Sequence, residues 1–145
     1  MPDRLSLIIH IDGGARGNPG PAAAGVVIQN AQNSQYLHEA GYFLGRATNN
    51  VAEYQGLLHG LKKAADLGAE SVQIHSDSEL MVRQINGEYR VKSAHLRPLH
   101  AEAQSLLNHF THWTMQHVRR EQNKLADDLA NRAIDAQNDV HFESQ

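Results

Sequence analysis

The sequence contains no cysteine, and it lacks both a long hydrophobic run and an excess of basic charge. Without cysteine, the chain has no disulfides, no thiolate nucleophile, no zinc–cysteine site and no ligands for an iron–sulfur cluster. The apolar stretch from Leu5 to Ile11 is far shorter than the roughly 20 residues that span a bilayer, and it lacks the basic start and the cleavage site of a secretory signal. The sequence therefore predicts a cytoplasmic protein that makes no contact with membranes.

The net charge of -3 argues against a protein that coats nucleic acid, because phosphate binding depends on Lys and Arg. It is compatible with a nuclease, because a site for divalent cations needs clustered carboxylates, which lower the net charge without changing a basic surface elsewhere. With 145 residues, 41% of them hydrophobic, the chain has the size and composition of one domain with its own core. We expect a monomer.

The order of hydrophobic periods predicts an α/β domain with a mixed sheet. Three strands in an antiparallel meander are expected at 5–12, where the strand ends in Gly13-Gly14, at 24–29 and at 35–44, and two parallel additions are expected at 72–76 and 113–118. Helices are expected between Thr48 and Gly68, at 79–86, at 96–110 and after Asn123, whose side chain we expect to cap the last helix. The prediction is a five-stranded sheet flanked by helices, with residues 1–137 as the domain and 138–145 as a frayed polar tail.

Four acidic residues stand where these elements would gather them. Asp12 and Asp77 end predicted strands, while Glu53 and Asp127 lie near the starts of predicted helices. Ligands of open sheets gather at the carboxyl ends of the strands, so the four carboxylates are expected to converge. Oxygen ligands suit Mg²⁺, and two such ions can activate water and stabilise the leaving oxygen in phosphodiester hydrolysis.

Each acid taken alone has an ordinary structural explanation. Asp12 could open a turn at Gly13, and Asp77 could be the N-cap of the following helix. Glu53 and Asp127 could complement helix dipoles. The joint placement of the four favours a metal site.

Four short motifs strengthen this interpretation by their order and spacing. They are IDGG at 11–14 with GNPG at 17–20, TNNVAE at 48–53, SDS at 76–78 and ADDLA at 126–130. Together they resemble the type 1 ribonuclease H family over nearly the whole chain, from about Leu7 to Ala136.

The resemblance implies an endonuclease that hydrolyses the RNA strand of RNA/DNA hybrids by two-metal-ion catalysis and leaves 5′-phosphate and 3′-hydroxyl ends. It implies that two Mg²⁺ ions, with Mn²⁺ as a substitute, are held by Asp12, Glu53, Asp77 and Asp127. Asp128 competes for the fourth place, but the family's aspartate precedes an acidic residue and then Leu-Ala, which selects Asp127. Short relatives also suggest double-stranded RNA as a second substrate.

The same matching implies the contacts with substrate. Asn18 and Thr48 would hold a phosphate of the DNA strand, and Asn50 would contact RNA 2′-hydroxyls, the groups that distinguish RNA from DNA. The remaining residues matched to substrate contacts are Ser78, Glu79 and Arg119.

The chain departs from the family pattern at three places. Glu79 stands where many bacterial members have glutamine, and Arg119 lies in a loop where many have histidine. The segment 86–97 is too short and too weakly basic for the substrate-binding protrusion of some relatives, so we expect a lower affinity for the hybrid. No hybrid-binding domain precedes the first strand, so we expect a stand-alone enzyme.

Two other functions compete with this one. A junction resolvase or an exonuclease could use the same fold, and the Asn49-Asn50 pair and the GNPG turn speak against it. A catalytically inactive binding module is the second rival. All four acids are present, which speaks against a module that would gain nothing from burying like charges.

Overall fold

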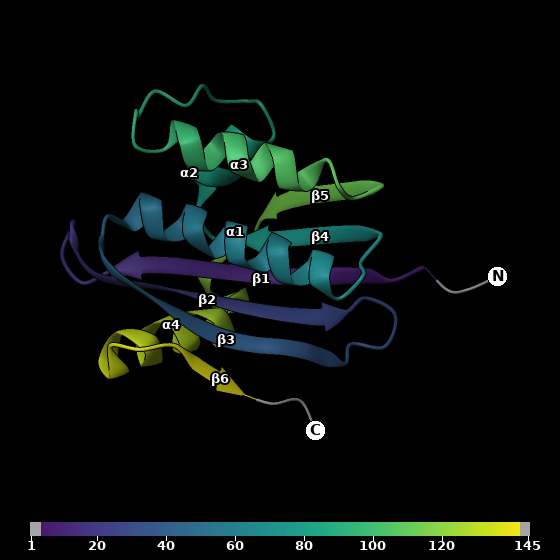
Figure 1. The fold of residues 1–145 in the computed structure, drawn as a ribbon, viewed down its shortest axis with the longest axis horizontal. Coiled ribbons are helices and arrows are strands. Elements are labelled where there is room, and N and C mark those ends of the chain that lie inside the picture. Colours follow the sequence, from purple (N-terminus) through teal and green to yellow (C-terminus); the bar gives the residue numbers. More distant parts are fainter. Residues whose placement is uncertain (1–3, 143–145) are drawn as a thin grey trace.

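The structure is a computed structural model that describes residues 4–142, and its centre is a six-stranded sheet (Figure 1). The strands are β1 (Ser6–Ala15), β2 (Gly20–Asn30), β3 (Tyr36–Ala47), β4 (Ser71–Ser76), β5 (His112–His117) and β6 (Val140–Phe142). They lie in the order β5-β4-β1-β2-β3-β6, antiparallel from β1 through β2 and β3 to β6 and parallel from β1 through β4 to β5. This confirms the mixed sheet with three antiparallel strands and two parallel additions.

Helices cover both faces of the sheet. They are α1 (Asn49–Asp66), α2 (Glu79–Ile85), α3 (Arg97–Leu107) and α4 (Lys124–Ala136), with a short 3-10 helix, η1 (Arg120–Gln122), before α4. Helix α1 packs on β1 and β2 with α3 beside it, whereas α4 lies on the opposite face against β2 and β3 (Figure 1). Within residues 4–142, no helix combines the length and the apolar character that a membrane span requires.

The main core lies between β1 and α1. Leu7, Ile9 and Ile11 alternate along β1 and are fully buried, as the period-two pattern predicts. They belong to the same buried cluster as Leu57 and Leu61, which recur at helical spacing in α1. The switch from period two to period 3.6 along the chain therefore sets which residues meet in the core.

Two glycines of α1 allow this helix to lie close to the sheet. A Cβ on Gly56 would come 2.7 Å from Cγ2 of Ile11, and one on Gly60 would come 2.9 Å from Cγ2 of Ile9. These separations are shorter than ordinary van der Waals contact, so larger residues would push α1 outward. These two glycines therefore set the distance between α1 and the sheet.

The predicted number of strands is wrong, because the sheet continues beyond residue 137. In β6, Val140 pairs opposite Gly41 and Phe142 opposite Glu39 on the edge of β3. The guanidinium of Arg132 in α4 also lies 5.3 Å from the centre of the Phe142 ring. A strand of three residues shows no periodicity, so only its pairing with β3 reveals it, and the expected frayed tail is instead partly ordered. Residues 143–145 of that tail lie outside the described residues.

Helix α4 lies so close to the sheet that two strand residues must lack a side chain. A Cβ on Gly25 in β2 would overlap the carbonyl of Ala126, and one on Gly41 in β3 would overlap the carbonyl of Leu129. Backbone atoms of a packed helix do not yield as the end of a flexible side chain does. The position of α4 on the sheet therefore depends on these glycines.

We expect Gly25→Ala to lower the free energy of unfolding by at least about 3 kcal/mol, because α4 has to move away from β2. Gly45→Ala is the matched control, since Gly45 has a positive φ of 71° but no atom within 4 Å of an added Cβ. The free energy of unfolding of the control should fall by only about 1 kcal/mol, which is the strain of an alanine in the left-handed conformation. Urea unfolding of both variants measures the difference, and equal losses would contradict the proposed role of the α4 contact.

Candidate active site

Asp12 and Asp77 lie beside each other because their strands are parallel neighbours. Ile11 in β1 pairs with Ser76 in β4, so the next residue of each strand comes to the same edge of the sheet. Strand β1 continues past its predicted end in Gly13-Gly14, because it pairs with β2 as far as Ala15. Asp12 is thus held inside a paired strand and does not open a turn.

Glu53 reaches the same edge from α1. A Cβ on Gly13 would lie 2.5 Å from the backbone of Ala52 and Glu53, so only glycine allows the helix to come this close. The Gly13 N–H donates a 2.6 Å hydrogen bond to Oε1 of Glu53. This bond holds the Glu53 carboxylate, which is 8% exposed, against the end of β1.

The three acids form a compact group. One carboxylate oxygen from each of Asp12, Glu53 and Asp77 lies within 4.8 Å of the other two. They line a cleft of about 350 Å³ that also includes Asp127 and Arg120. The structure therefore brings the four predicted acids to one cleft, from two strands and two helices.

Asp127 approaches from the first turn of α4. It makes a side-chain hydrogen bond with Asp12 and lines the cleft. Its neighbour Asp128 turns away from the cleft, and its Oδ2 accepts a 2.8 Å hydrogen bond from Nε of Arg132. The geometry thus separates the two adjacent aspartates that the sequence left in competition.

Burial and mutual repulsion make these carboxylates hard to ionise together. Burial, reinforced by the charges of Glu53, Asp77 and Asp127 and by the Asp127 hydrogen bond, raises the pKa of Asp12 to about 9. Burial and the Asp77 charge raise the pKa of Glu53 to about 8, although the Gly13 N–H and the Arg120 charge act in the opposite direction. Such a group is strained unless protons or cations neutralise it.

The donor set fits a divalent cation. Carboxylate oxygens are hard ligands, and three of them from three separate elements lie close enough to share an ion. Burial and the neighbouring negative charges raise the pKa values of Asp12 and Glu53. A cation between the carboxylates would offset the repulsion that favours their protonated forms. The cluster is therefore compatible with divalent metal ions.

Arg120 is the basic residue that the fold brings to the acids. Its Nε lies 3.8 Å from Oδ2 of Asp77, and its side chain is 82% exposed. Arg119, which the sequence favoured, precedes η1, is exposed and does not line the cleft. The sequence showed two adjacent arginines, but the turn of η1 determines which one faces Asp77.

The residues predicted to contact substrate phosphate and 2′-hydroxyls lie together in a second cleft. Asn18, Thr48 and Asn50 line this cleft of about 440 Å³. Arg46 and His95 line it as well, and the sequence analysis did not single them out. Arg46 lies two residues before the TNNVAE motif, so its position could have been noticed, whereas His95 comes from a distant loop.

Two of these side chains also order the start of α1. Thr48 is the N-cap, and its hydroxyl oxygen accepts a 3.2 Å hydrogen bond from the Val51 N–H. Asn18 Oδ1 accepts a 3.0 Å hydrogen bond from the Asn49 N–H. The side chains that line the second cleft are thus held by the same contacts that begin the helix carrying Glu53.

Ser78 and Glu79 have local structural partners. Ser78 is the N-cap of α2 and accepts a 3.2 Å hydrogen bond from the Met81 N–H. This excludes Asp77 as the N-cap, the alternative that the sequence left open. Glu79 pairs with Arg83 at 3.0 Å, and neither Ser78 nor Glu79 lines the acidic cleft.

The predicted side-chain cap at Asn123 is wrong. Asn123 occupies the N-cap position of α4, but its side chain accepts no hydrogen bond from the helix. Its Nδ2 instead donates a 2.7 Å hydrogen bond to the carbonyl of Ile11, the residue before Asp12. Asn123 therefore ties the start of α4 to β1, a contact across 112 sequence positions that the sequence could not reveal.

Comparison with known proteins agrees with this geometry. A family model described as "Reverse transcriptase-like" matches residues 10–133, which places the chain in that class of protein. Ribonuclease HI of Halobacterium salinarum is 41% identical over 136 residues, which cover 93% of this chain and 68% of that protein. The chain belongs to the ribonuclease H family, as the sequence motifs suggested.

Further relatives confirm the fold at high coverage. The bifunctional protein Rv2228c of Mycobacterium tuberculosis is 46% identical over 132 residues, and the chain spans only 36% of its length. The solved N-terminal RNase H domain of that protein superposes with a TM-score of 0.88 at 45% identity, covering 91% of this chain and 95% of that one. LC11-RNase H1 in complex with an RNA/DNA hybrid gives a TM-score of 0.85 at 40% identity, covering 90% of this chain and 98% of that one.

Proposed function

We propose that this chain is an endoribonuclease that hydrolyses the RNA strand of RNA/DNA hybrids and leaves 5′-phosphate and 3′-hydroxyl ends. It acts as a monomer in the cytoplasm, with two Mg²⁺ ions that Mn²⁺ can replace. Asp12, Glu53, Asp77 and Asp127 hold these ions. Double-stranded RNA is a second, poorer substrate.

The observation that carries this proposal is the group of three carboxylates within 4.8 Å of one another. Three buried or half-buried acids destabilise a fold unless protons or cations neutralise them, so their convergence at one sheet edge favours a catalytic metal centre over a binding module. Family membership and the relative solved with an RNA/DNA hybrid support this class of substrate.

Metal binding and DNA binding are assigned to two different clefts. In the acidic cleft, the carboxylates provide ligands for the ions, which when bound supply the Lewis acidity that phosphodiester hydrolysis requires. Arg120, beside Asp77, offers a positive charge to the phosphate that enters this cleft. In the second cleft, Asn18, Thr48 and Arg46 offer polar and cationic groups to a DNA phosphate.

Asn50 is the residue that recognises the RNA strand, through its 2′-hydroxyl groups. It lines the second cleft together with Thr48, and it also lines the neighbouring cleft of about 500 Å³ that contains Arg90 and Lys92. Its amide can both donate to and accept from a 2′-hydroxyl. This contact would read the sugar and not the base, so we expect cleavage without base-sequence specificity.

The test is cleavage of one labelled RNA strand annealed to DNA, to RNA or to nothing, in Mg²⁺, in Mn²⁺ and in EDTA. We expect metal-dependent cutting of the hybrid's RNA, at least tenfold faster than cutting of the RNA duplex. Products should be extended by a polymerase, which requires 3′-hydroxyl ends. Binding of the hybrid without cutting in either metal would refute the nuclease and favour the binding module.

Asp127→Asn is expected to lower the rate of hybrid cleavage roughly a hundredfold, because it removes one charge from a half-buried ligand beside Asp12. Asp128→Asn is the matched control on the adjacent residue, whose carboxylate pairs with Arg132 outside the cleft. Its rate should stay within twofold of wild type. Initial rates at saturating Mg²⁺ measure both variants, and a larger loss in Asp128→Asn would show that the wrong aspartate has been assigned.

A further inference from the structure

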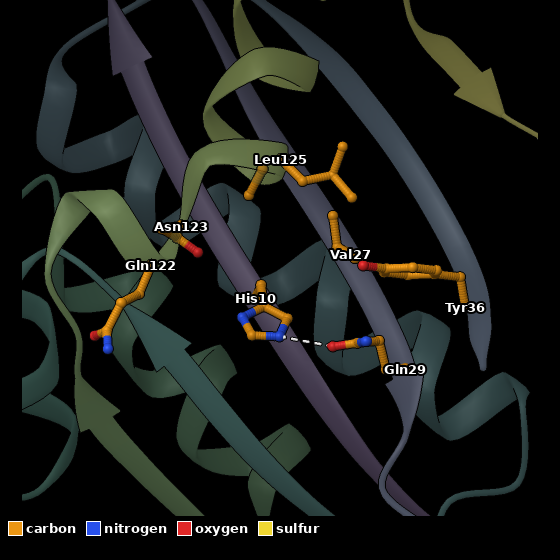
Figure 2. A pocket seen from close by; sticks show the side chains of 8 residues that line it. His10, Val27, Gln29, Tyr36, Gln122, Asn123 and Leu125 are labelled. Atoms are coloured by element: carbon orange, nitrogen blue, oxygen red, sulfur yellow. Dashed lines mark hydrogen bonds between the residues drawn. The ribbon is translucent and has the colours of Figure 1, made fainter. Parts of the chain in front are cut away.

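A fourth cavity lies on the face of the sheet that carries α4, and it shares no lining residue with the three clefts described above. It has a volume of about 240 Å³ and lies between strands β1 to β3 and the start of α4 (Figure 2). Its lining residues are His10, Val27, Gln29, Tyr36, Gln122, Asn123, Leu125 and Ala126. None of these residues has a role in the proposed function.

The cavity contains a buried acceptor that no described residue satisfies. Asn123 is only 2% exposed, and its Nδ2 is committed to the Ile11 carbonyl. No group within residues 4–142 donates a hydrogen bond to its Oδ1. Figure 2 shows this oxygen on the side of Asn123 that faces the cavity. An unsatisfied buried carbonyl is costly, so a hydrogen-bond donor inside the cavity would stabilise it.

His10 presents a second acceptor to the same cavity. Its Nε2 lies 3.0 Å from Oε1 of Gln29, and the orientation of that amide is set by the bond from Gln29 Nε2 to the Ser34 carbonyl. Because an amide oxygen can only accept, His10 Nε2 is the donor, which leaves the lone pair of the neutral ring on Nδ1. Figure 2 shows this second ring nitrogen on the side facing Gln122 and Asn123.

The walls limit the kind of molecule that fits. The described residues that line the cavity include no Asp, Glu, Lys or Arg, so a charged ligand would be buried without a counter-charge. Val27 and Ala126 are buried and form apolar walls, and Tyr36 and Leu125, which are 42% and 38% exposed, add further apolar surface. The volume is below the roughly 300–1,000 Å³ of pockets for drug-sized ligands, so a single heterocycle is the appropriate size.

We propose that this cavity binds one uncharged, planar heterocycle whose amino group donates hydrogen bonds to Asn123 Oδ1 and His10 Nδ1, the chemistry of adenine and cytosine. The ring would stack beside Tyr36, as bases stack on aromatic side chains. Such a base has two sources: a free nucleobase, or an unpaired base of a nucleic acid. The proposal goes beyond the nuclease activity and does not depend on it.

Titration of ¹⁵N-labelled protein with adenine, cytosine and thymine tests the proposal without any activity measurement. Adenine and cytosine should shift the Asn123 side-chain amide and the backbone amides of Val27 and Ala126. Thymine lacks the amino group and should bind at least tenfold more weakly. Equal affinities for the three bases, or no shifts at millimolar base, would overturn the proposal.

Variants locate the site while keeping the Asn123 contact with β1. His10→Phe retains a ring of similar shape but removes the acceptor, and Tyr36→Ser removes the aromatic wall; each should weaken adenine binding at least tenfold. Phe142→Ser is the matched control, because Phe142 is an equally exposed aromatic residue that does not line the cavity. Wild-type affinity in both cavity variants would refute the assignment.

Hybrids with a single unpaired adenine or thymine at the DNA end distinguish the two sources. If the cavity takes a base of a nucleic acid, the adenine overhang should shift the same amides and bind at least threefold more tightly than the thymine overhang. If it takes a free base, adenine alone should shift them. If neither probe does so, the cavity binds no base and the proposal fails.

Discussion

Asp77→Asn should lower kcat for hybrid cleavage about a thousandfold or more, while the dissociation constant of the hybrid changes less than threefold. Asp77 belongs to the group of carboxylates within 4.8 Å of one another, so the amide removes one charged ligand from the centre of the site. Its side chain is 12% exposed, and Arg120 is the ion-pair partner that it loses. Single-turnover cleavage in Mg²⁺ and fluorescence polarisation in EDTA measure the two quantities.

Asp66→Asn is the control for this experiment. Asp66 is an exposed acid at the last residue of α1, far along the helix from Glu53, and the substitution makes the same chemical change. Its kcat should match that of wild type. An Asp77→Asn enzyme that retained a tenth of wild-type activity would show that the three acids are not the centre of catalysis.

Asp12→Asn should make the protein in EDTA more stable than wild type, by an amount that increases with pH. The pKa of Asp12 is raised from 3.8 to about 9 in the folded protein, mainly by burial and then by the charge of Glu53. Asparagine has nearly the same shape and needs no proton. The variant therefore removes a pH-dependent destabilisation and loses cleavage activity at the same time.

The sign of this effect follows from proton binding. Above a pH of about 4 the unfolded chain releases the Asp12 proton, whereas the folded protein keeps it until the pH approaches the folded pKa of about 9. The stabilising contribution of Asp12 is thus complete below the unfolded pKa and is lost as the pH rises through this window. Glu53, whose pKa is raised from 4.5 to about 8, also loses stabilising free energy as the pH rises, over a narrower pH range than Asp12.

Urea unfolding at pH 6 and pH 8 in EDTA measures the prediction. The advantage of Asp12→Asn in free energy of unfolding should grow by at most about 3 kcal/mol over these two pH units, since one pKa unit corresponds to about 1.4 kcal/mol. Asp66→Asn should show no such growth, because Asp66 is exposed. An advantage that shrinks with rising pH would contradict the raised pKa of Asp12.

Patterns confined to one segment of chain were predicted well. The helix from Thr48 to Gly68 has its cap, its apolar stripe and its terminal glycine in the sequence, and the structure places α1 there with Thr48 as the N-cap. The parallel arrangement of β1 and β4 also follows from the intervening helix. With these strands side by side, the proximity of Asp12 and Asp77 is a consequence of the carboxyl ends of adjacent strands.

Features that depend on pairing between distant segments were not predicted. Strand β6 has three residues and exists because β3 offers an unpaired edge to it. Asn123 looked like a helix cap, yet its amide is used by the Ile11 carbonyl. The choice of Arg120 over Arg119 depends on the geometry of η1. In each case several partners were chemically acceptable, and only their distances could select one.

The sequence by itself determined the order of the first five strands and the four α-helices, the four acids that the fold gathers in one cleft, and the family to which the chain belongs. These properties follow from the local periodicity of hydrophobic residues and from motifs a few residues long. The tertiary structure alone decided that three carboxylates come within 4.8 Å of one another, that the pKa values of Asp12 and Glu53 are raised, and that the side-chain carbonyl of Asn123 lies beside a separate cavity. Burial and mutual repulsion are properties of groups brought together across the fold, so no segment of the sequence contains them.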